Sequence, residues 1–372
     1  MNLKLYFWQN IISPHQFPYI DKLTLDERIK EVYLIVPAAN SGYREKMGID
    51  SSQYLNGRVS KVNIVIAPTD CLIQKIYELS DENTYHFYSG IRGFKEIFYY
   101  FKLSLSYQLN RGLIVEPPYV YKYPLFLHYI RFYLQDFQYV NKIKYVYGMG
   151  ERACKYYKSI SKKWRVFPFQ YCTDLEIELP CISSKDANQG FSMVFVGAFS
   201  RRKNVYSLLK AFRKCNIGEL SLDLIGDGEY KTLIENYIRK YHLEKKVRLL
   251  GFMSNKEVKQ VISQYDLLVL PSLYDGWGAV VNEALLQGLY VICSNKCGAR
   301  QLIVQPWIGM ISGTSVKKLY NSMVTCWNNR FIIKGGRYQR RKWAVNIQSD
   351  TSAKYFADCL LGIISKKPWE NE

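Results

Sequence analysis

In the first half of the chain, short apolar runs alternate with longer stretches whose apolar residues recur at helical spacing. The short runs predict strands and the longer stretches predict helices. The expected strands cover residues 3–7, 32–36, 62–67, 85–88, 112–115 and 145–147, and the clearest helices cover 72–79, 94–109 and 125–140. Such alternation is typical of a parallel sheet with crossover helices.

A second alternation of the same kind follows a break in the pattern. Residues 174–190 are largely polar and include Pro180, which predicts a linker between two domains. Beyond it we expect strands at 192–196, 220–225, 247–250, 267–270 and 290–293, and helices at 205–215, 230–241, 255–264, 280–287 and 353–364. We therefore predict an α/β protein with two doubly wound domains, residues 1–173 and 191–349, followed by a closing amphipathic helix within residues 350–372.

The composition agrees with a globular protein of two domains. Of the 372 residues, 48% are apolar and 22% are charged, which excludes a disordered chain, a fibrous repeat and a small disulfide scaffold. We find neither an apolar run long enough for a transmembrane helix nor a secretion signal at the N-terminus. The nine cysteines are scattered and there are four histidines, so we expect reduced thiols and no metal site.

The chain is strongly basic, with 51 Lys and Arg against 32 Asp and Glu and a formal net charge of +19. The balance is +6 over residues 1–180 and +13 over residues 181–372. A basic surface attracts phosphates in nucleic acid, anionic lipid and nucleotides alike. Charge alone therefore indicates an anionic ligand and leaves its class open.

Ligands of open parallel sheets bind beyond the carboxyl ends of the strands, so residues that follow each strand are the first candidates. After the strand at 192–196, Gly197 begins a loop that ends with Arg201, Arg202 and Lys203 before a helix. Cations at a helix N-terminus oppose its dipole by roughly 0.3–1 kcal/mol each, and a bound anion would relieve that conflict. This pattern favours an anion site over a solvated run of charges.

Two further loops follow strands of the second domain. The first holds Gly226, Asp227 and Gly228, whose glycines would admit a ligand to the backbone or simply serve a strand-to-helix turn. The second holds Asp275 eight positions before Glu283, with Gly276, Trp277 and Gly278 in between. The two carboxylates could face a polyhydroxyl ligand and the glycine amides a phosphate, or the segment could be only a helix cap.

Taken in order, these motifs resemble the donor-binding domain of retaining glycosyltransferases of family 4, which have the GT-B fold. The resemblance is clear over residues 191–303 and is nearest to members that build bacterial surface polysaccharides. It rests on Gly197, Arg202-Lys203, Gly226-Asp227-Gly228, Pro271-Ser272, Asp275-x7-Glu283, Ala284 and Gly288. It implies two Rossmann-like domains facing a central cleft, the first binding the acceptor and the second the donor, with the C-terminal helix returning to the first domain.

The resemblance also implies roles. Arg202 and Lys203 would neutralise the donor diphosphate as it leaves, with no metal and no other cofactor. Glu283 would accept hydrogen bonds from the donor ribose, and Asp275 would hold hydroxyls of the donor sugar. The remaining donor-binding positions would be Gly197, Arg201, Gly226, Asp227, Gly228, Gly276, Trp277 and Gly278. The chain departs from the family at Asp275, where Glu is usual, and at Ala198, where many members have Arg.

The first domain offers candidates for the acceptor side. Its first loop lacks the glycines that many members carry there and contains His15, which could contact acceptor or phosphate, or simply cap a helix. Ser89, Gly90 and Arg92 follow the fourth expected strand, and Glu116 follows the fifth. We expect these residues to line the acceptor side of the cleft.

The expected function is transfer of a hexosyl group from a UDP- or GDP-sugar to a saccharide or lipid-pyrophosphate-linked acceptor. The aromatic, basic stretches at residues 94–109 and 119–139 suit either a packed core or an anionic membrane. Because members of the family often use lipid-linked acceptors, the resemblance implies a peripheral enzyme at the cytoplasmic face of the plasma membrane. The alternatives are a GT-B epimerase or phosphorylase, and a non-catalytic sugar- or polyanion-binding protein. Nucleic-acid binding is disfavoured because its usual motifs are missing.

Overall fold

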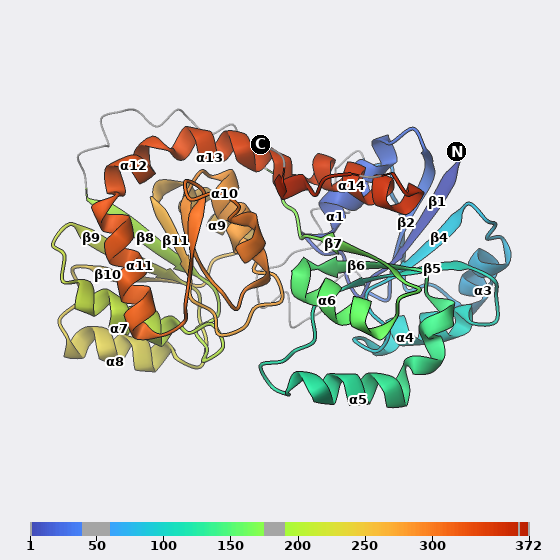
Figure 1. Ribbon diagram of the computed structural model, residues 1–372, viewed down its shortest axis with the longest axis horizontal. Coiled ribbons are helices and arrows are strands. Elements are labelled where there is room, and N and C mark those ends of the chain that lie inside the picture. The colour runs from blue at the N-terminus through green and yellow to red at the C-terminus, as the bar shows by residue number, and fades with distance from the viewer. Residues whose placement is uncertain (1, 39–59, 175–189, 364, 371–372) are drawn as a thin grey trace. The chain divides into compact units, whose positions relative to one another are not determined.

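The computed structural model describes residues 2–38, 60–174, 190–363 and 365–370, and it divides into two compact units (Figure 1). Unit 1 comprises Met1–Thr173 and Ile347–Asn371, and unit 2 comprises Asp174–Asn346. The expected linker at residues 174–190 lies almost wholly outside the described residues. Each unit is an α/β layer structure with its own core.

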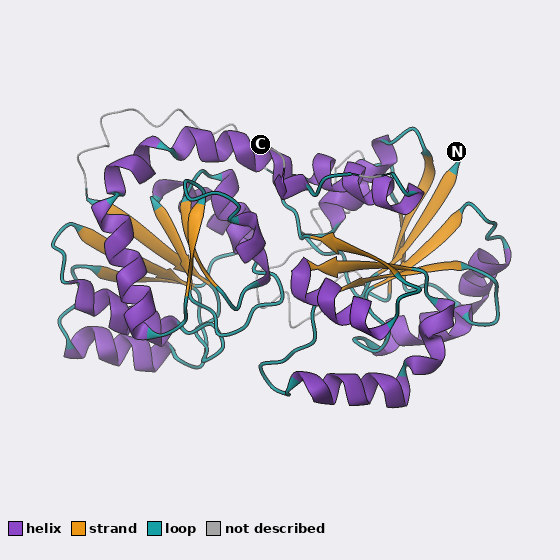
Figure 2. Ribbon diagram, viewed as in Figure 1, coloured by secondary structure: helices purple, strands orange, loops and turns teal. Residues whose placement is uncertain are grey.

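Unit 1 is a seven-stranded parallel sheet with helices on both faces (Figure 2). Its strands are β1 (Leu3–Trp8), β2 (Ile29–Val36), β3 (Asn63–Ile66), β4 (Thr84–Tyr88), β5 (Asn110–Val115), β6 (Tyr145–Met149) and β7 (Arg165–Phe169). Its helices are α1 (Phe17–Lys22), α3 (Asp70–Glu78), α4 (Lys95–Ser104), α5 (Leu125–Gln135), α6 (Gly150–Ile160) and α14 (Ser349–Leu361). The strand order is β3-β2-β1-β4-β5-β6-β7.

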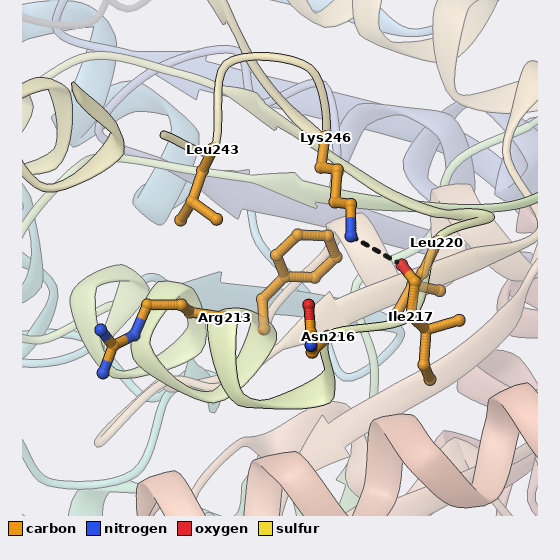
Figure 3. Close-up of a pocket in the computed structure, with 7 residues that line it drawn as sticks. Arg213, Asn216, Ile217, Leu220, Leu243 and Lys246 are labelled. Atoms are coloured by element: carbon orange, nitrogen blue, oxygen red, sulfur yellow. Dashed lines mark hydrogen bonds between the residues drawn. The ribbon is translucent and has the colours of Figure 1, made fainter. Parts of the chain in front are cut away.

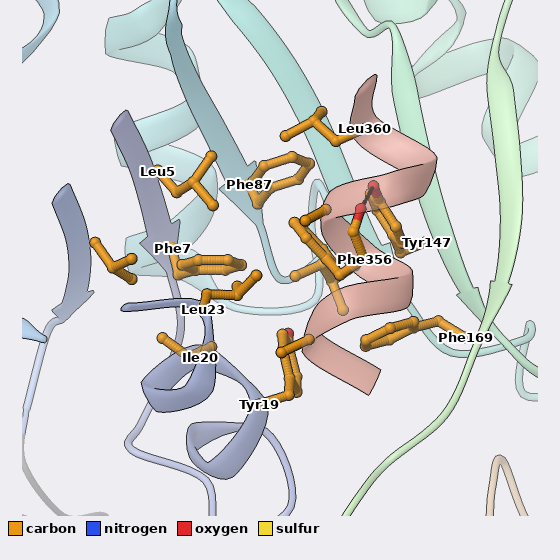
Figure 4. Close-up of a cluster of buried hydrophobic side chains, with 14 of the residues drawn as sticks. Leu5, Phe7, Tyr19, Ile20, Leu23, Phe87, Tyr147, Phe169, Phe356 and Leu360 are labelled. Carbon is orange, nitrogen blue, oxygen red and sulfur yellow. Dashed lines mark hydrogen bonds between the residues drawn. The ribbon is translucent and has the colours of Figure 1, made fainter. Parts of the chain in front are cut away.

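The side chains of β1 alternate between two cores, as the pleat of a strand requires. Tyr6 and Trp8 pack beneath α3, α4 and α6, whereas Leu5 and Phe7 pack beneath α1 and α14. Phe356 of α14 lies at the centre of the second core, with its ring centroid 5.6 Å from that of Phe7 (Figure 4). The last helix of the chain is therefore part of the core of unit 1.

Unit 2 is a six-stranded parallel sheet in the order β10-β9-β8-β11-β12-β13. Its strands are β8 (Phe191–Val196), β9 (Leu220–Ile225), β10 (Val247–Gly251), β11 (Leu267–Leu270), β12 (Tyr290–Ser294) and β13 (Gly309–Ser312). Its helices are α7 (Val205–Cys215), α8 (Lys231–Lys240), α9 (Asn255–Val261), α10 (Val280–Leu286), α11 (Val316–Asn328), α12 (Arg330–Gly335) and α13 (Arg337–Ala344).

The structure corrects several of the predicted elements, and the helix expected over 94–109 ends at Ser104. Two edge strands, β7 and β13, are missing from the predicted pattern; β7 contains Pro168, which a sheet tolerates only at an edge or bulge and which weakens the strand signal. The helix expected over 125–140 ends at Gln135, and a 3₁₀ turn follows over Phe137–Lys142. The residue between them, Asp136, leaves helical geometry and binds Arg92 from another loop, so a tertiary contact overrides the local periodicity.

Candidate active site

The candidate site of unit 2 forms where the strand order of its sheet reverses. The chain runs from β8 to β9 on one side, while β11 pairs with β8 on the other. Loops that leave neighbouring strands in opposite directions open a crevice at the carboxyl edge of the sheet, where ligands of such sheets bind. The two loops concerned are residues 197–204 after β8 and residues 271–279 after β11.

The loops after β8 and β9 hold each other in place. The amide of Phe199 donates to the carbonyl of Asp227 at 2.8 Å, and the amide of Tyr230 donates back to the carbonyl of Phe199 at 2.9 Å. Gly226 has φ +143°, and a Cβ there would overlap the carbonyl oxygen of Gly197. Gly226 therefore allows the two loops to approach closely. The contact between them fixes the first loop, which carries the cations at its end.

The cations of the first loop meet a carboxylate of the second. Lys203 Nζ lies 2.5 Å from Asp275 Oδ2, and Arg202 Nη1 lies 3.7 Å from Asp275 Oδ1. Arg202 also donates to the carbonyl of Tyr274 at 3.1 Å, while Ser272 donates to Asp275 Oδ2 at 3.4 Å. Three of the expected site residues are thus brought together, with two positive charges and one negative. Arg201, the third cation of the run, is exposed.

Asn204 is a site residue that the sequence motifs do not reveal. It stands directly before α7 in the left-handed conformation, with φ +59°, and its side chain is buried. Its Nδ2 donates to the carbonyls of Pro271 at 3.0 Å and Thr314 at 2.9 Å. Asn204 therefore fastens the cationic loop to the ends of β11 and β13. The available signal is its type, because Asn is favoured before helices.

Glu283 occupies the first turn of α10 and is 5% exposed. Asn255, the first residue of α9, donates from Nδ2 to Glu283 Oε1 at 2.7 Å. Burial raises the pKa of Glu283, and the hydrogen bond from Asn255 and the charge of Lys259 partly offset that rise. The carboxylate is held in one orientation by a residue of a different helix, α9, and local sequence patterns do not show this contact.

The glycine loop between Asp275 and Glu283 is packed against the chain that follows β12. Trp277 is 1% exposed, and its indole donates to Asn282 Oδ1 at 2.8 Å, so its ring belongs to the core. Gly278 has φ +98°, and a Cβ there would lie 2.7 Å from the sulfur of Cys297. A donor contact from Trp277 would thus have to come from its backbone. Gly276 is covered on its carbonyl side by Gly298.

The loop after β9 carries the remaining candidates. Asp227 is exposed, and Lys231 lies 3.1 Å away in an ion pair. The hydrogen bond from Lys231 holds the pKa of the Asp227 carboxyl below its usual range. A Cβ on Gly228 would lie 2.7 Å from the carbonyl oxygen of Phe199, so this glycine too serves the contact between loops. Donor-binding roles for these residues and for Gly197 stay predictions.

In unit 1, two of the expected acceptor residues meet through a third. The ring of His15 stacks on Tyr171, with centroids 6.1 Å apart, and the Tyr171 hydroxyl donates to Glu116 Oε1 at 2.6 Å. The amide of Cys172 donates to the carbonyl of His15 at 3.1 Å. His15 and Glu116 are about a hundred positions apart in the chain but lie in one cluster at the carboxyl edge of the sheet. Tyr171, among 32 tyrosines, carries no distinguishing sequence signal.

The other three candidates of unit 1 lie along one loop. The amide of Ser89 donates to the carbonyl of Trp8 at 3.0 Å, and Gly90 turns the chain with φ +85°. Arg92 Nε lies 2.5 Å from Asp136 Oδ1, and its guanidinium lies 4.2 Å from the ring centroid of Phe98. Arg92 thus holds the end of α5 to α4, and an acceptor role for it stays a prediction.

Two other features bear on ligand chemistry. Among the described residues, no three His, Cys, Asp or Glu side chains gather as a metal ion would need. A small hollow is lined by Phe212, Arg213, Asn216, Ile217, Leu220, Leu243 and Lys246 (Figure 3). These residues lie at or before the starts of β9 and β10, at the opposite end of the strands from the candidate site, and Lys246 Nζ donates to the carbonyl of Ile217 at 3.2 Å.

The sequence of unit 2 matches a known family. Residues 183–319 match the family Glycosyl transferases group 1. An uncharacterized 41.2 kDa protein in the cps region of Klebsiella pneumoniae is 25% identical over 171 residues, which is 46% of this chain and 41% of that protein. The N-acetylgalactosamine-N,N'-diacetylbacillosaminyl-diphospho-undecaprenol 4-alpha-N-acetylgalactosaminyltransferase of Campylobacter jejuni is 29% identical over 117 residues, 31% of each chain. The chain matches less than half the length of these relatives.

The fold has a full-length counterpart among solved structures. Anabaena HepE, crystallised in complex with UDP, superposes with a TM-score of 0.72 at 15% identity, covering 97% of this chain and 100% of that one. At this identity the likeness concerns the fold alone. The predicted GT-B fold, with two parallel-sheet Rossmann-like domains, is confirmed.

Proposed function

We propose that the chain is a retaining glycosyltransferase of family 4 that transfers a sugar from a UDP- or GDP-sugar without a metal ion. One observation carries the proposal: Arg202 and Lys203 converge at the strand reversal of unit 2 on the loop that holds Asp275. A pair of fixed cations at that edge suits the diphosphate of a nucleotide sugar. The match of residues 183–319 to group 1 glycosyl transferases supports this assignment.

Each residue then has a task in the transfer. As the bond between sugar and diphosphate breaks, negative charge grows on the diphosphate, and Arg202 and Lys203 stabilise it. Because Asn204 fixes their loop in advance, little reorganisation is needed at that moment. Glu283, oriented by Asn255, accepts hydrogen bonds from the ribose hydroxyls. The acceptor attacks from the face that the diphosphate leaves, so no protein nucleophile takes part.

We further propose that the acceptor is a saccharide, free or linked to a lipid diphosphate, in the synthesis of a bacterial surface polysaccharide. The name of the Campylobacter relative states a diphospho-undecaprenol acceptor, and the Klebsiella relative is described as lying in a cps region. The cluster of His15, Tyr171 and Glu116 would bind acceptor hydroxyls on unit 1. The enzyme would work in the cytoplasm, at the inner face of the plasma membrane.

The test is hydrolysis of UDP-, GDP- and ADP-sugars by the purified chain without acceptor. We expect one UDP- or GDP-sugar to be hydrolysed slowly and Lys203→Ala to lower kcat/KM about 10²–10³-fold, as loss of a charge-stabilising group does. Lys214→Ala is the matched control, since this exposed lysine lies at the far end of α7. Full turnover by Lys203→Ala, or failure to bind any sugar nucleotide, would contradict the proposal.

A further inference from the structure

Helix α5 exposes apolar side chains on the side that faces away from unit 1. Leu134 is 79% exposed, Phe126 60%, and Ile130 and Tyr133 are each 49% exposed. Ile130, Tyr133 and Leu134 follow Phe126 at helical spacings of four, seven and eight, so these four residues share one side of the helix. We call them the α5 face. Figure 1 shows α5 at the lower edge of unit 1, with no other element of that unit beyond it.

The opposite side of α5 is already occupied by unit 1. Phe132 is buried against Trp164, with centroids 6.1 Å apart, and the Tyr156 hydroxyl donates to the carbonyl of His128 at 3.1 Å. The hydroxyls of Tyr129 and Ser159 lie 2.7 Å apart. Helix α5 is therefore apolar on both sides, although only one is buried. A helix that is apolar on all sides is normally buried on all sides. Because unit 1 buries only one side of α5, we expect the α5 face to bind something other than unit 1.

The chain around α5 is strongly basic. Residues 117–163 contain nine Lys and Arg and two acidic residues, and one of those acids, Asp136, is paired with Arg92. Lys122 and Arg131 are exposed beside the α5 face, and exposed tyrosines precede it at 119, 121 and 123. Aromatic and apolar residues bordered by cations are the composition of helices that lie in a membrane interface.

We propose that the α5 face docks on an anionic lipid bilayer, with the helix lying in the interface and its cations on the headgroups. Eleven residues span less than the roughly 30 Å of a bilayer core, and no helix within the described residues is long and apolar enough to cross it. A second copy of the chain is the poorer occupant, since the same positive charge would face itself. The inference deepens the proposed function, because it names the surface that would meet a lipid-linked acceptor.

The test is sedimentation of the full chain with vesicles of phosphatidylcholine, with and without phosphatidylglycerol. We expect binding to the anionic vesicles that weakens with salt. The double variant Phe126→Ser/Leu134→Ser should bind the anionic vesicles at least about tenfold more weakly than the wild type. Phe331→Ser/Ile332→Ser is the matched control, because both residues are highly exposed on α12 of unit 2. If the double variant is poorly folded, Lys122→Glu/Arg131→Glu should weaken binding in the same way.

The inference would be overturned if Phe126→Ser/Leu134→Ser and Lys122→Glu/Arg131→Glu both bound vesicles as well as the wild type does. A dimer of the wild type in sedimentation velocity that Phe126→Ser/Leu134→Ser dissociates would also overturn it, because the α5 face would then cover a second copy. Hydrolysis of the sugar nucleotide in solution should be unchanged in this variant. Vesicle binding by a chain that hydrolyses no sugar nucleotide would support the membrane face while contradicting the proposed function, so the two failures are distinguishable.

Discussion

The ammonium group of Lys203 lies 2.5 Å from a carboxylate oxygen of Asp275, in a pair that joins the two loops of the strand reversal in unit 2. The resemblance to family 4 assigns the lysine to the donor diphosphate and the aspartate to the donor sugar. In the structure the two candidate groups neutralise each other. A diphosphate at this site would therefore compete with Asp275 for the same cation.

Replacement of Asp275 by Asn keeps the shape of the side chain and removes its charge. We expect UDP or GDP to bind about tenfold more tightly, roughly the effect of one competing charge near a protein surface. We expect sugar transfer to fall, because the carboxylate for the sugar hydroxyls is gone. Titration calorimetry measures the first effect and a transfer assay the second. The control is Glu244→Gln, an exposed acid of the same unit. Unchanged or weaker nucleotide binding by Asp275→Asn would contradict this relation.

The buried carboxyl of Glu283 should make stability depend on pH. Burial raises its pKa in the folded chain, so the folded state binds a proton where the unfolded state has lost it. The stabilising contribution is present below the usual pKa of Glu and is lost as the pH rises through the folded value. Glu283→Gln can keep the hydrogen bond from Asn255 and cannot ionise.

We therefore expect Glu283→Gln to have a higher Tm than the wild type at neutral pH, while sugar transfer is lost. The difference in Tm should vanish in acid. Calorimetric melting across the acid and neutral range measures both. A variant that is less stable than the wild type at neutral pH would show that the ionised carboxylate is well compensated in the folded chain.

Asn204 allows its two structural roles to be separated. Asn204→Gly keeps the left-handed backbone and loses both side-chain hydrogen bonds, whereas Asn204→Ala also strains the backbone. We expect a loss of about 1–3 kcal/mol in the free energy of unfolding for the glycine variant and a larger loss for alanine. Urea denaturation measures both. If Asn204→Gly leaves the free energy of unfolding unchanged, the hydrogen bonds to Pro271 and Thr314 do not hold the loop.

Gly226 should tolerate no side chain. A Cβ there would overlap the carbonyl of Gly197 and would have to adopt φ +143°, so Gly226→Ala should cost about 2 kcal/mol or more. Gly218→Ala is the control, because nothing lies within 4 Å of a Cβ at that position and its change should stay within about 1 kcal/mol. Equal stability of the two variants would mean that the contact between the loops is loose.

The sequence pattern predicts the parts of this molecule that local periodicity encodes. The buried strands β8, β9, β11 and β12 are all predicted, and the loops after β8, β9 and β11 hold candidate residues of unit 2. The edge strand β7 is not predicted, because Pro168 weakens its strand pattern. The contact partners of the candidate residues are not predicted either, because they lie far away in the sequence. Tyr171 joins His15 to Glu116, and Asn255 binds Glu283. The position of Trp277 in the sequence predicts a donor-binding side chain, yet packing buries its ring.

The place of α14 in the core of unit 1 has a consequence for how the chain folds during translation. Unit 2 is continuous in sequence, so it can fold as soon as its last strand and helices have emerged. The segment Met1–Thr173 of unit 1 is synthesised first but lacks Phe356, the ring at the centre of one of its two cores, until α14 is made after unit 2. This segment must therefore wait, with an open apolar surface, until the whole of unit 2 and then α14 have been synthesised.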